Sequence, residues 1–439
     1  MHVMLIHQAF ISPKEAGGTR HLELGQRFVR EGNDFTIVAS NLSYHSGKQV
    51  EPPADGIEQY DGVRVCRAWT LAALHRSYVW RVVSFLSFMV SSVWTAVRVR
   101  NVDLVMGTSP PIFQLLSAWL VSVLKRVPFV LEVRDLWPEF AIDIGLLKNP
   151  SLIWFARKLE MFLYNRATHI VVNSPAYREY LIHKGVPEAK VSFVANGVDT
   201  SLFTDTIDGS HLRNEFDLAG KFVVTYAGAI GMANDLDVVL DAADRLRDSH
   251  DVKFLIVGDG KERSRLEQRA QDMGLSNVTF TGPRPKAEMP QFLAMSDACL
   301  ATLQDIPMFK TTYPNKVFDY MAAARPTILG IDGVIRDVVE KADGGIAVPP
   351  GNADALAHAV AELARDRNRA IAMGRSARAY VEQHFDRDPT GHRVPRHDST
   401  SGHEGGPHDG RSLWTPIGRL LTSPFSLKGR GTTLVLRRT

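Results

Sequence analysis

The chain has 439 residues, more than one hydrophobic core usually organises, so we expect two domains. Its composition, 45% hydrophobic and 23% charged, is ordinary for a globular protein, and a net charge of +3 is too small to indicate a nucleic-acid partner. Two cysteines, Cys66 and Cys299, have no metal-ligand or redox spacing, which fits a reducing cytoplasm.

The chain begins with a short apolar stretch, residues 2–7, that predicts a strand and lacks the basic start of a secretion signal. A loop over 8–19 follows, and from there strand, loop and helix alternate along most of the chain. This alternation predicts parallel sheets with helices on both faces. Ligands bind beyond the carboxyl ends of strands in such sheets, so Gly17, Gly18 and Arg20 become candidates for a loop that contacts a ligand. A wide turn is the alternative for the glycine pair.

The segment from Tyr78 to Arg100 departs from this alternation. No charge lies between Arg81 and Arg98, and aromatic residues crowd the run. A bilayer span takes roughly 20 apolar residues, and this run is shorter and interrupted by serines. We therefore expect a helix lying on a membrane, with a serine face on the domain, an aromatic face toward lipid, and flanking arginines near anionic headgroups. A buried core helix and a true span are the alternatives.

Charged residues gather after a strand predicted over 129–133. Arg134, Asp135 and Glu139 surround a Trp-Pro pair. Packing explains charges at this position poorly, whereas strand ends are where ligands bind in α/β sheets. Arg134 and Asp135 are therefore candidate active-site residues.

Changes in composition suggest the domain boundaries. The first alternating set of strands and helices covers 1–200, and the polar, acidic segment 201–220 is expected to be an irregular linker. A second set covers 221–387. Proline, glycine, histidine and serine dominate 388–439, where apolar periodicity is nearly lost, so we expect no fold there.

Glycines and polar residues end the strands predicted in the second domain. The first strand leads to Gly228, Gly231 and Asn234, where a following helix N-terminus could cradle phosphate. Later strands end at Gly258 and near Arg284, and these loops should project from one sheet edge. None forms a G-x-G-x-x-G run with an acidic residue about 20 positions on, and no P-loop is present. Neither a nicotinamide site nor a P-loop site is indicated.

The segment 311–330 carries the most informative pattern. Pro314 can occupy the first turn of a helix. Asn315 and Asp319 lie four residues apart on one face, and Lys316 is beside them. The free N–H groups of the helix start and the Lys316 charge suit a diphosphate, while Asp319 can accept from two sugar hydroxyls. A well-capped core helix with a solvated aspartate is the alternative.

In this order and spacing, the motifs resemble the retaining glycosyltransferases of family 4, and especially their WbuB-like branch, which builds bacterial surface polysaccharides. The resemblance covers about residues 1–387. It rests on the Gly17-Gly18 loop, Val133–Glu139, Asn196–Asp199, Gly228-x-x-Gly231, Gly258–Gly260 and Tyr313–Ala323. It implies an α/β fold of the GT-B type, in which two Rossmann-like doubly wound domains face across a cleft.

The resemblance also implies roles for residues. The second domain would hold a nucleotide-sugar donor, with Asp319 on the ribose and Lys316 on the phosphates, and Asp135 and Arg134 would contact the reacting sugar. The first domain would hold the acceptor, with Gly17, Gly18 and Arg20 on an acceptor-side loop. Family members commonly carry a glutamate where Thr311 stands. Many also have a phosphate-binding lysine at the position of Asn234, a charge that Lys316 or Arg284 would replace.

Further expectations follow from the family. Transfer would retain the anomeric configuration and would need no cofactor or metal. The donor would be a UDP-linked amino sugar and the acceptor a polyprenyl-diphosphate saccharide, with the enzyme peripheral on the inner face of the cell membrane. A helix from about Ala377 would begin to return to the first domain and end early at Asp388-Pro389. A sugar-nucleotide 2-epimerase and an inactive nucleotide-sugar-binding subunit are the alternative functions.

Overall fold

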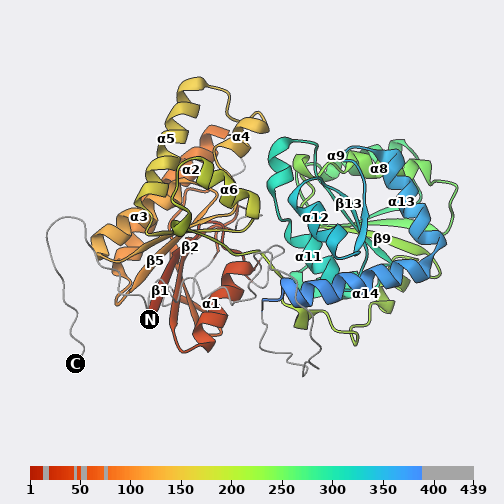
Figure 1. The fold of residues 1–439 in the computed structure, drawn as a ribbon, viewed down its shortest axis with the longest axis horizontal. Coiled ribbons are helices and arrows are strands. Elements are labelled where there is room, and N and C mark those ends of the chain that lie inside the picture. The colour runs from red at the N-terminus through yellow and green to blue at the C-terminus, as the bar shows by residue number, and fades with distance from the viewer. Residues whose placement is uncertain (13–18, 44–46, 51–56, 74–77, 388–439) are drawn as a thin grey trace, which may run out of the picture.

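The computed structural model describes residues 1–12, 19–43, 47–50, 57–73 and 78–387 of the chain (Figure 1). Two separate sheets, each flanked by helices on both faces, form two domains side by side. The predicted α/β fold of two doubly wound domains is confirmed.

Over the described residues, the first sheet has eight strands in the order β3-β4-β2-β1-β5-β6-β7-β8, and only β3 and β4 pair antiparallel. Its strands are β1 His2–Ile6, β2 Asp34–Ser40, β3 Ile57–Tyr60, β4 Val63–Ala68, β5 Leu104–Ser109, β6 Phe129–Val133, β7 His169–Val172 and β8 Val191–Phe193. The principal helices are α1 Arg20–Arg30, α2 Tyr78–Arg98, α3 Phe113–Lys125, α4 Glu139–Asp143, α5 Pro150–Arg166 and α6 Pro175–His183. The central strands are buried along their whole length because helices cover both faces of the sheet.

The second sheet is wholly parallel, in the order β11-β10-β9-β12-β13-β14. Its strands are β9 Phe222–Ala227, β10 Val252–Val257, β11 Val278–Gly282, β12 Ala298–Thr302, β13 Thr327–Gly330 and β14 Gly345–Ala347. The principal helices are α8 Asp237–Arg245, α9 Arg263–Asp272, α10 Met289–Ala294, α11 Asn315–Ala322, α12 Val334–Lys341, α13 Ala353–Arg365 and α14 Arg367–His384. The central strand of this order, β9, begins the domain, so strands are added on both sides of it.

The segment 201–220 is not irregular throughout, and this part of the linker prediction is wrong. It contains a helix, α7 Ser210–Glu215, whose Leu212 is buried against Val223 and Leu255 of the second domain. Burial of this single leucine stabilises the short helix within a polar segment, because tertiary packing outweighs a weak local helix propensity.

Helix α14 is longer than expected: it begins at Arg367 and runs along the second domain with its C-terminal end toward the first (Figure 1). The residues after it reach the end of the first domain, where the Val198 N–H donates to the Phe385 carbonyl at 3.0 Å and the Arg387 N–H to the Val198 carbonyl at 2.9 Å. The expected tail over 388–439 lies outside the described residues.

Helix α2 packs one face on the first domain, as predicted for its serines. The Ser84 hydroxyl donates to the Leu71 carbonyl at 2.8 Å, and the Leu71 N–H donates to the Ser87 hydroxyl at 2.9 Å. The expected aromatic outer face is only partly right, because Phe88 is fully buried in the core whereas Trp94 is 68% exposed. Over the described part of the chain, this helix alone has the length and composition to cross a membrane, which is weak evidence for a span.

Candidate active site

The glycine loops of the second domain meet at one edge of its sheet, as predicted. The Gly228 N–H, just after β9, donates to the Val257 carbonyl at 2.9 Å, and the Gly258 N–H donates to the Gly282 carbonyl at 3.0 Å. Gly258 has φ of +145°, and a Cβ there would lie 1.9 Å from the Gly228 carbonyl oxygen. Glycine is therefore required at this position, because a side chain there would collide with the loop of Gly228.

Lys316 crosses from the start of α11 to the end of β9. Its Nζ donates to the Tyr226 hydroxyl at 2.7 Å and to Asn234 Oδ1 at 3.3 Å, and it lies 3.9 Å from the centre of the Tyr226 ring. A Cβ on Gly228 would lie 2.9 Å from the same Nζ. Burial lowers the pKa of Lys316 to about 7. The fold thus brings Gly228, Asn234 and Lys316 together into one group.

Asn315 and Asp319 present acceptor oxygens beside this group. Helix α11 begins at Asn315, so Pro314 directly precedes the helix instead of lying in its first turn as predicted. Asn315 Oδ1 is buried and has no hydrogen-bond partner among the described residues. Burial raises the pKa of Asp319, against the opposing effect of Lys286 and Arg387. Its carboxylate accepts no hydrogen bond within the described part of the chain, so both side chains are available to a ligand.

Arg284 is held away from this group. Its Nη2 donates to Glu215 Oε1 at 3.1 Å, and its guanidinium lies 5.6 Å from the ring centre of Phe216 and 5.5 Å from that of Phe292. Of the two cations that could replace the family lysine, the structure places Lys316 beside Asn234. Gly231 stands at the start of the same turn, where a Cβ would lie 3.8 Å from Asn234 Nδ2.

Thr311 is turned toward its own segment and the first domain. It ends the short helix η5 Pro307–Thr311, and its hydroxyl donates to the Met308 carbonyl at 2.5 Å. Its carbonyl accepts from the Ser174 hydroxyl at 2.5 Å, and Phe309 lies 5.9 Å from Phe140 between ring centres. This position therefore contributes to contact between the domains and offers no carboxylate to a sugar.

A buried ionic cluster lies near the carboxyl end of β6 in the first sheet. Glu132 of β6 is 1% exposed, and it accepts from His21 Nε2 at 2.6 Å and Arg20 Nη2 at 3.3 Å. Arg20 also donates to the Asn196 carbonyl at 3.1 Å. Burial opposes ionisation of Glu132, but His21 and Arg20 hold the pKa of its carboxyl well below the usual range. Arg20 is thus committed to an ion pair, whereas Gly17 and Gly18 lie outside the described residues.

His7 lies next to this cluster. The sequence predicted neither His7 nor the cluster as part of a site. The His7 ring lies 4.3 Å from that of His21 between centres, and its Nδ1 is buried with no partner among the described residues. Burial, with His21 and Arg134 nearby, holds the pKa of His7 well below its usual value. One signal was present in the sequence: Glu132 is a charge inside the apolar run Phe-Val-Leu-Glu-Val.

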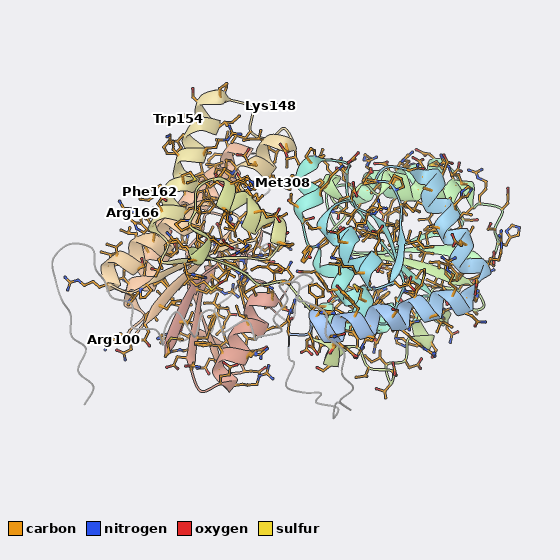
Figure 2. All side chains as sticks on the ribbon, in the orientation of Figure 1. Arg100, Lys148, Trp154, Phe162, Arg166 and Met308 are labelled. Atoms are coloured by element: carbon orange, nitrogen blue, oxygen red, sulfur yellow. The ribbon has the colours of Figure 1, made fainter. Side chains whose placement is uncertain are left out.

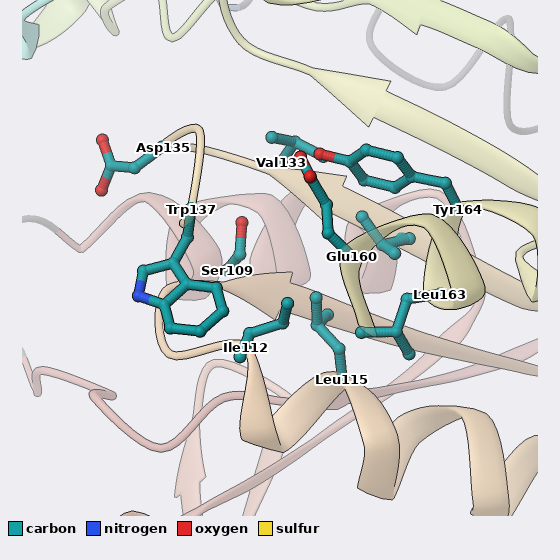
Figure 3. A pocket seen from close by; sticks show the side chains of 10 residues that line it. Ser109, Ile112, Leu115, Val133, Asp135, Trp137, Glu160, Leu163 and Tyr164 are labelled. Carbon is teal, nitrogen blue, oxygen red and sulfur yellow. The ribbon is translucent and has the colours of Figure 1, made fainter. Parts of the chain in front are cut away.

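Arg134 and Asp135 stand just after β6. Asp135 lines a small cavity with Trp137, Glu160 and Tyr164, and its carboxylate points away from the apolar residues there (Figure 3). Burial raises the pKa of Asp135 to about 6, although Arg134 acts in the opposite direction. Within the described ranges, no hydrogen bond or ion pair joins Arg134 or Asp135 to Lys316.

Loops from the carboxyl edges of both sheets are in contact. Lys286 Nζ donates to Glu23 Oε1 at 3.0 Å and to the Thr19 hydroxyl at 3.1 Å, and Asn196 Nδ2 donates to the Tyr313 carbonyl at 2.9 Å. Arg387 also pairs with Glu23. Burial would raise the pKa of Glu23, but Arg387 and Lys286 lower it to about 2. The described residues include no group of three His, Cys, Asp or Glu side chains suited to a metal.

Two Rossmann-like domains that meet at their carboxyl edges, with a lysine and glycine loops on the second, define the GT-B class of glycosyltransferase. Family models agree: one described as glycosyl transferases group 1 matches residues 221–366, and one described as glycosyl transferase 4-like domain matches 16–197. The chain belongs to this family of glycosyltransferases, and the predicted family 4 membership is confirmed.

Individual relatives are distant. The putative colanic acid biosynthesis glycosyl transferase WcaI of Escherichia coli K12 is 27% identical over 69% of this chain and 75% of its own. A GDP-mannose-dependent alpha-mannosyltransferase of Mycobacterium tuberculosis is 26% identical over 86% of this chain and 92% of its own. The structure of Anabaena HepE in complex with UDP and glucose matches with a TM-score of 0.67 at 20% identity, over 88% of this chain and 96% of that one.

Proposed function

We propose that this glycosyltransferase moves a sugar from a nucleotide-sugar, in particular a UDP-linked amino sugar, to a lipid-linked saccharide during bacterial surface-polysaccharide synthesis. The observation that carries the proposal is the convergence of Lys316, Asn234 and Gly228 beside the free acceptors of Asn315 and Asp319. The UDP and glucose of HepE and the colanic acid pathway of WcaI support it, as similarities.

In this proposal each residue has a task. Lys316 stabilises the leaving diphosphate beside the loops of Gly228 and Gly258, and Asp319 accepts from the ribose hydroxyls. Asp135 and Arg134 contact the transferred sugar from the first domain. Because positioning and leaving-group stabilisation suffice, the anomeric configuration is retained without a protein nucleophile.

We further propose that no metal is needed, since Lys316 supplies the positive charge on the diphosphate. Activity in EDTA should equal activity in magnesium. A loss of activity in EDTA that magnesium restores would contradict this proposal.

The decisive experiment is a transfer assay with UDP-, GDP- and dTDP-sugars as donors and a polyprenyl-diphosphate saccharide as acceptor. We expect transfer from UDP-sugars to the lipid-linked acceptor, with the product α- or β-linkage matching that of the donor. Inverted product, or a 2-epimerised sugar without transfer, would overturn the proposal.

A second candidate is a subunit that binds a nucleotide-sugar without transferring it. The orientation of Thr311 favours this second candidate, because the Thr311 hydroxyl donates to the Met308 carbonyl and Thr311 offers no carboxylate at this position. Tight donor binding with no turnover on any lipid acceptor would select this candidate.

We also propose that the enzyme docks peripherally on the inner face of the cell membrane. Exposed apolar side chains on α2 form one stripe, which we call the docking stripe: Val79, Trp80, Val83, Leu86, Val90, Trp94 and Val97. From Trp80 onward they recur every three or four residues. Helix α2 contains no acidic residue, and Arg98 lies over the Trp94 ring at 4.1 Å. An apolar stripe with tryptophans and basic ends fits an anionic bilayer surface.

Neighbouring helices extend this surface. Leu120, Val123 and Leu124 are exposed on α3, which packs against α2. Trp154 on α5 is 63% exposed, and Figure 2 shows it on the outer side of that helix, away from Met308 and the second domain.

Sedimentation with vesicles tests the docking proposal. The double substitution Val90→Ser with Trp94→Ser should reduce partitioning onto phosphatidylglycerol vesicles about tenfold or more, because each exposed large apolar side chain contributes on the order of 1 kcal/mol or more when buried. Ile371→Ser is the matched control, since Ile371 is equally an exposed apolar residue, 50% exposed, but belongs to α14 of the second domain. Unchanged partitioning of the double variant would refute docking through this stripe.

A further inference from the structure

A second cavity lies at the opposite edge of the second sheet from the Lys316 group. It has a volume of about 700 Å³, within the usual range of small-molecule sites. Its lining includes Phe222 at the start of β9, Asp297 just before β12 and Pro326 just before β13. Since a strand of this length measures about 20 Å, the cavity is roughly that far from the carboxyl edge and is distinct from the donor site.

Among the charged side chains that line this cavity, more arginines than carboxylates lack an ion-pair partner within the described residues. Its arginines are Arg325, Arg367, Arg375 and Arg378, and its carboxylates are Asp205, Asp297 and Glu382. Two of the carboxylates already have partners, because Asp297 pairs with Arg213 at 2.8 Å and Glu382 with Arg378 at 2.5 Å. Arg367 also lies 3.9 Å from Asp297. Among the described lining residues, Arg325 and Arg375 are then the two arginines without an ion pair, against Asp205 as the one carboxylate without an ion pair.

Two arginines have unused donors. Arg325 Nη2 donates to the Ala294 carbonyl at 2.9 Å, but its Nε is buried and has no partner among the described residues. Arg375, on α14, is exposed and makes no hydrogen bond or ion pair within the described part of the chain. Buried donors in native proteins are nearly always bonded, so the Arg325 Nε indicates that an acceptor from outside the described residues belongs there.

We propose that this cavity binds a small phosphate ester, with Arg325 at its inner wall and Arg375 at its opening. The planar guanidinium group matches a phosphate in two parallel hydrogen bonds. Phe203 and Ile371 offer apolar surface to the carbon skeleton of the ligand. Residues 203–207, which connect the two domains, form part of the wall, so a bound ligand bridges the connecting segment and the second domain.

Titration calorimetry on the full chain with inorganic phosphate and with fructose 1,6-bisphosphate tests this proposal. Arg375→Gln should weaken binding of the bisphosphate about tenfold or more, because it removes a charge-assisted hydrogen bond. The matched control is Arg369→Gln, on the same helix and 47% exposed but outside the cavity, which should bind as the wild type does. Arg325→Gln, checked for folding by circular dichroism, should weaken binding as well.

Lys316→Met separates the two sites, because a phosphate ester could also enter the donor site. Binding that persists in Lys316→Met and falls in Arg375→Gln supports the proposal. It is overturned if neither probe binds the wild type, if Lys316→Met abolishes the binding, or if Arg375→Gln and Arg369→Gln bind equally well.

Discussion

Replacing Lys316 by Met should lower kcat/KM for the nucleotide-sugar by about 100-fold or more. The lysine provides the one full positive charge that contacts Asn234 at the donor edge among the described residues. Removing a preorganised donor to a developing negative charge costs on the order of 3 kcal/mol of transition-state stabilisation. Steady-state kinetics with saturating acceptor measures the effect.

The pH dependence gives this prediction a second readout. Because burial brings the pKa of Lys316 to about 7, the free enzyme loses this charge as the pH rises through 7, and donor affinity should fall with it. Lys316→Arg should show a flat profile over the same range, since a guanidinium stays protonated.

Replacing Lys316 by Met should affect the stability of the folded protein and its activity in opposite directions. The pKa of Lys316 in the folded protein lies below the ordinary value of 10.5, so burying the charged form opposes folding at and below pH 7. Lys316→Met should therefore keep or raise the urea midpoint at pH 6. Lys341→Met, at the exposed end of α12, is the control and should change neither property. Wild-type kcat/KM in Lys316→Met would contradict the assigned role.

Replacing Glu132 by Gln should destabilise the first domain by about 3 kcal/mol. The carboxylate compensates the charge of Arg20 and accepts from His21, and all three side chains are nearly inaccessible to solvent. Removing one member of a buried ion pair leaves the other charge without compensation. Urea denaturation at pH 7 should show a lower midpoint with an unchanged slope.

The effect should depend on pH in a defined direction. The native pKa of Glu132 is well below the ordinary value of 4.5, so its contribution is complete above about pH 4.5 and is lost as the pH falls toward the native pKa. The difference between wild type and Glu132→Gln should therefore shrink in acid. Glu31→Gln is the control, because Glu31 is 43% exposed in a helix-surface pair with Arg27 and such pairs contribute little. Equal midpoints for the two variants at pH 7 would contradict the prediction.

Local patterns in the sequence predict some features of this protein, whereas other features depend on contacts between segments that are far apart in the chain. Alternation of strands and helices predicted two parallel sheets, and because the carboxyl ends of parallel strands share one edge, it also predicted that the loops of Gly228 and Gly258 meet. Helix α7 was missed because its stability comes from the burial of Leu212, which no local pattern reveals. The serine face of α2 was predicted by helical spacing, whereas the burial of Phe88 depended on what packs against it.

The sequence by itself determined the fold class and the family and proposed the segments of the candidate site, since these depend on periodicity, glycine placement and motif order along the chain. Only the tertiary structure decided which cation stands beside Asn234. From the sequence, either Lys316 or Arg284 could supply this charge. In the structure, Arg284 contacts Glu215, Phe216 and Phe292. Lys316 donates to Asn234, which lies 82 residues earlier in the chain. Likewise the cluster of Glu132, Arg20 and His21 exists because separate elements converge in a space without water, where the charges of Glu132 and Arg20 require each other and His21 donates to the same carboxylate.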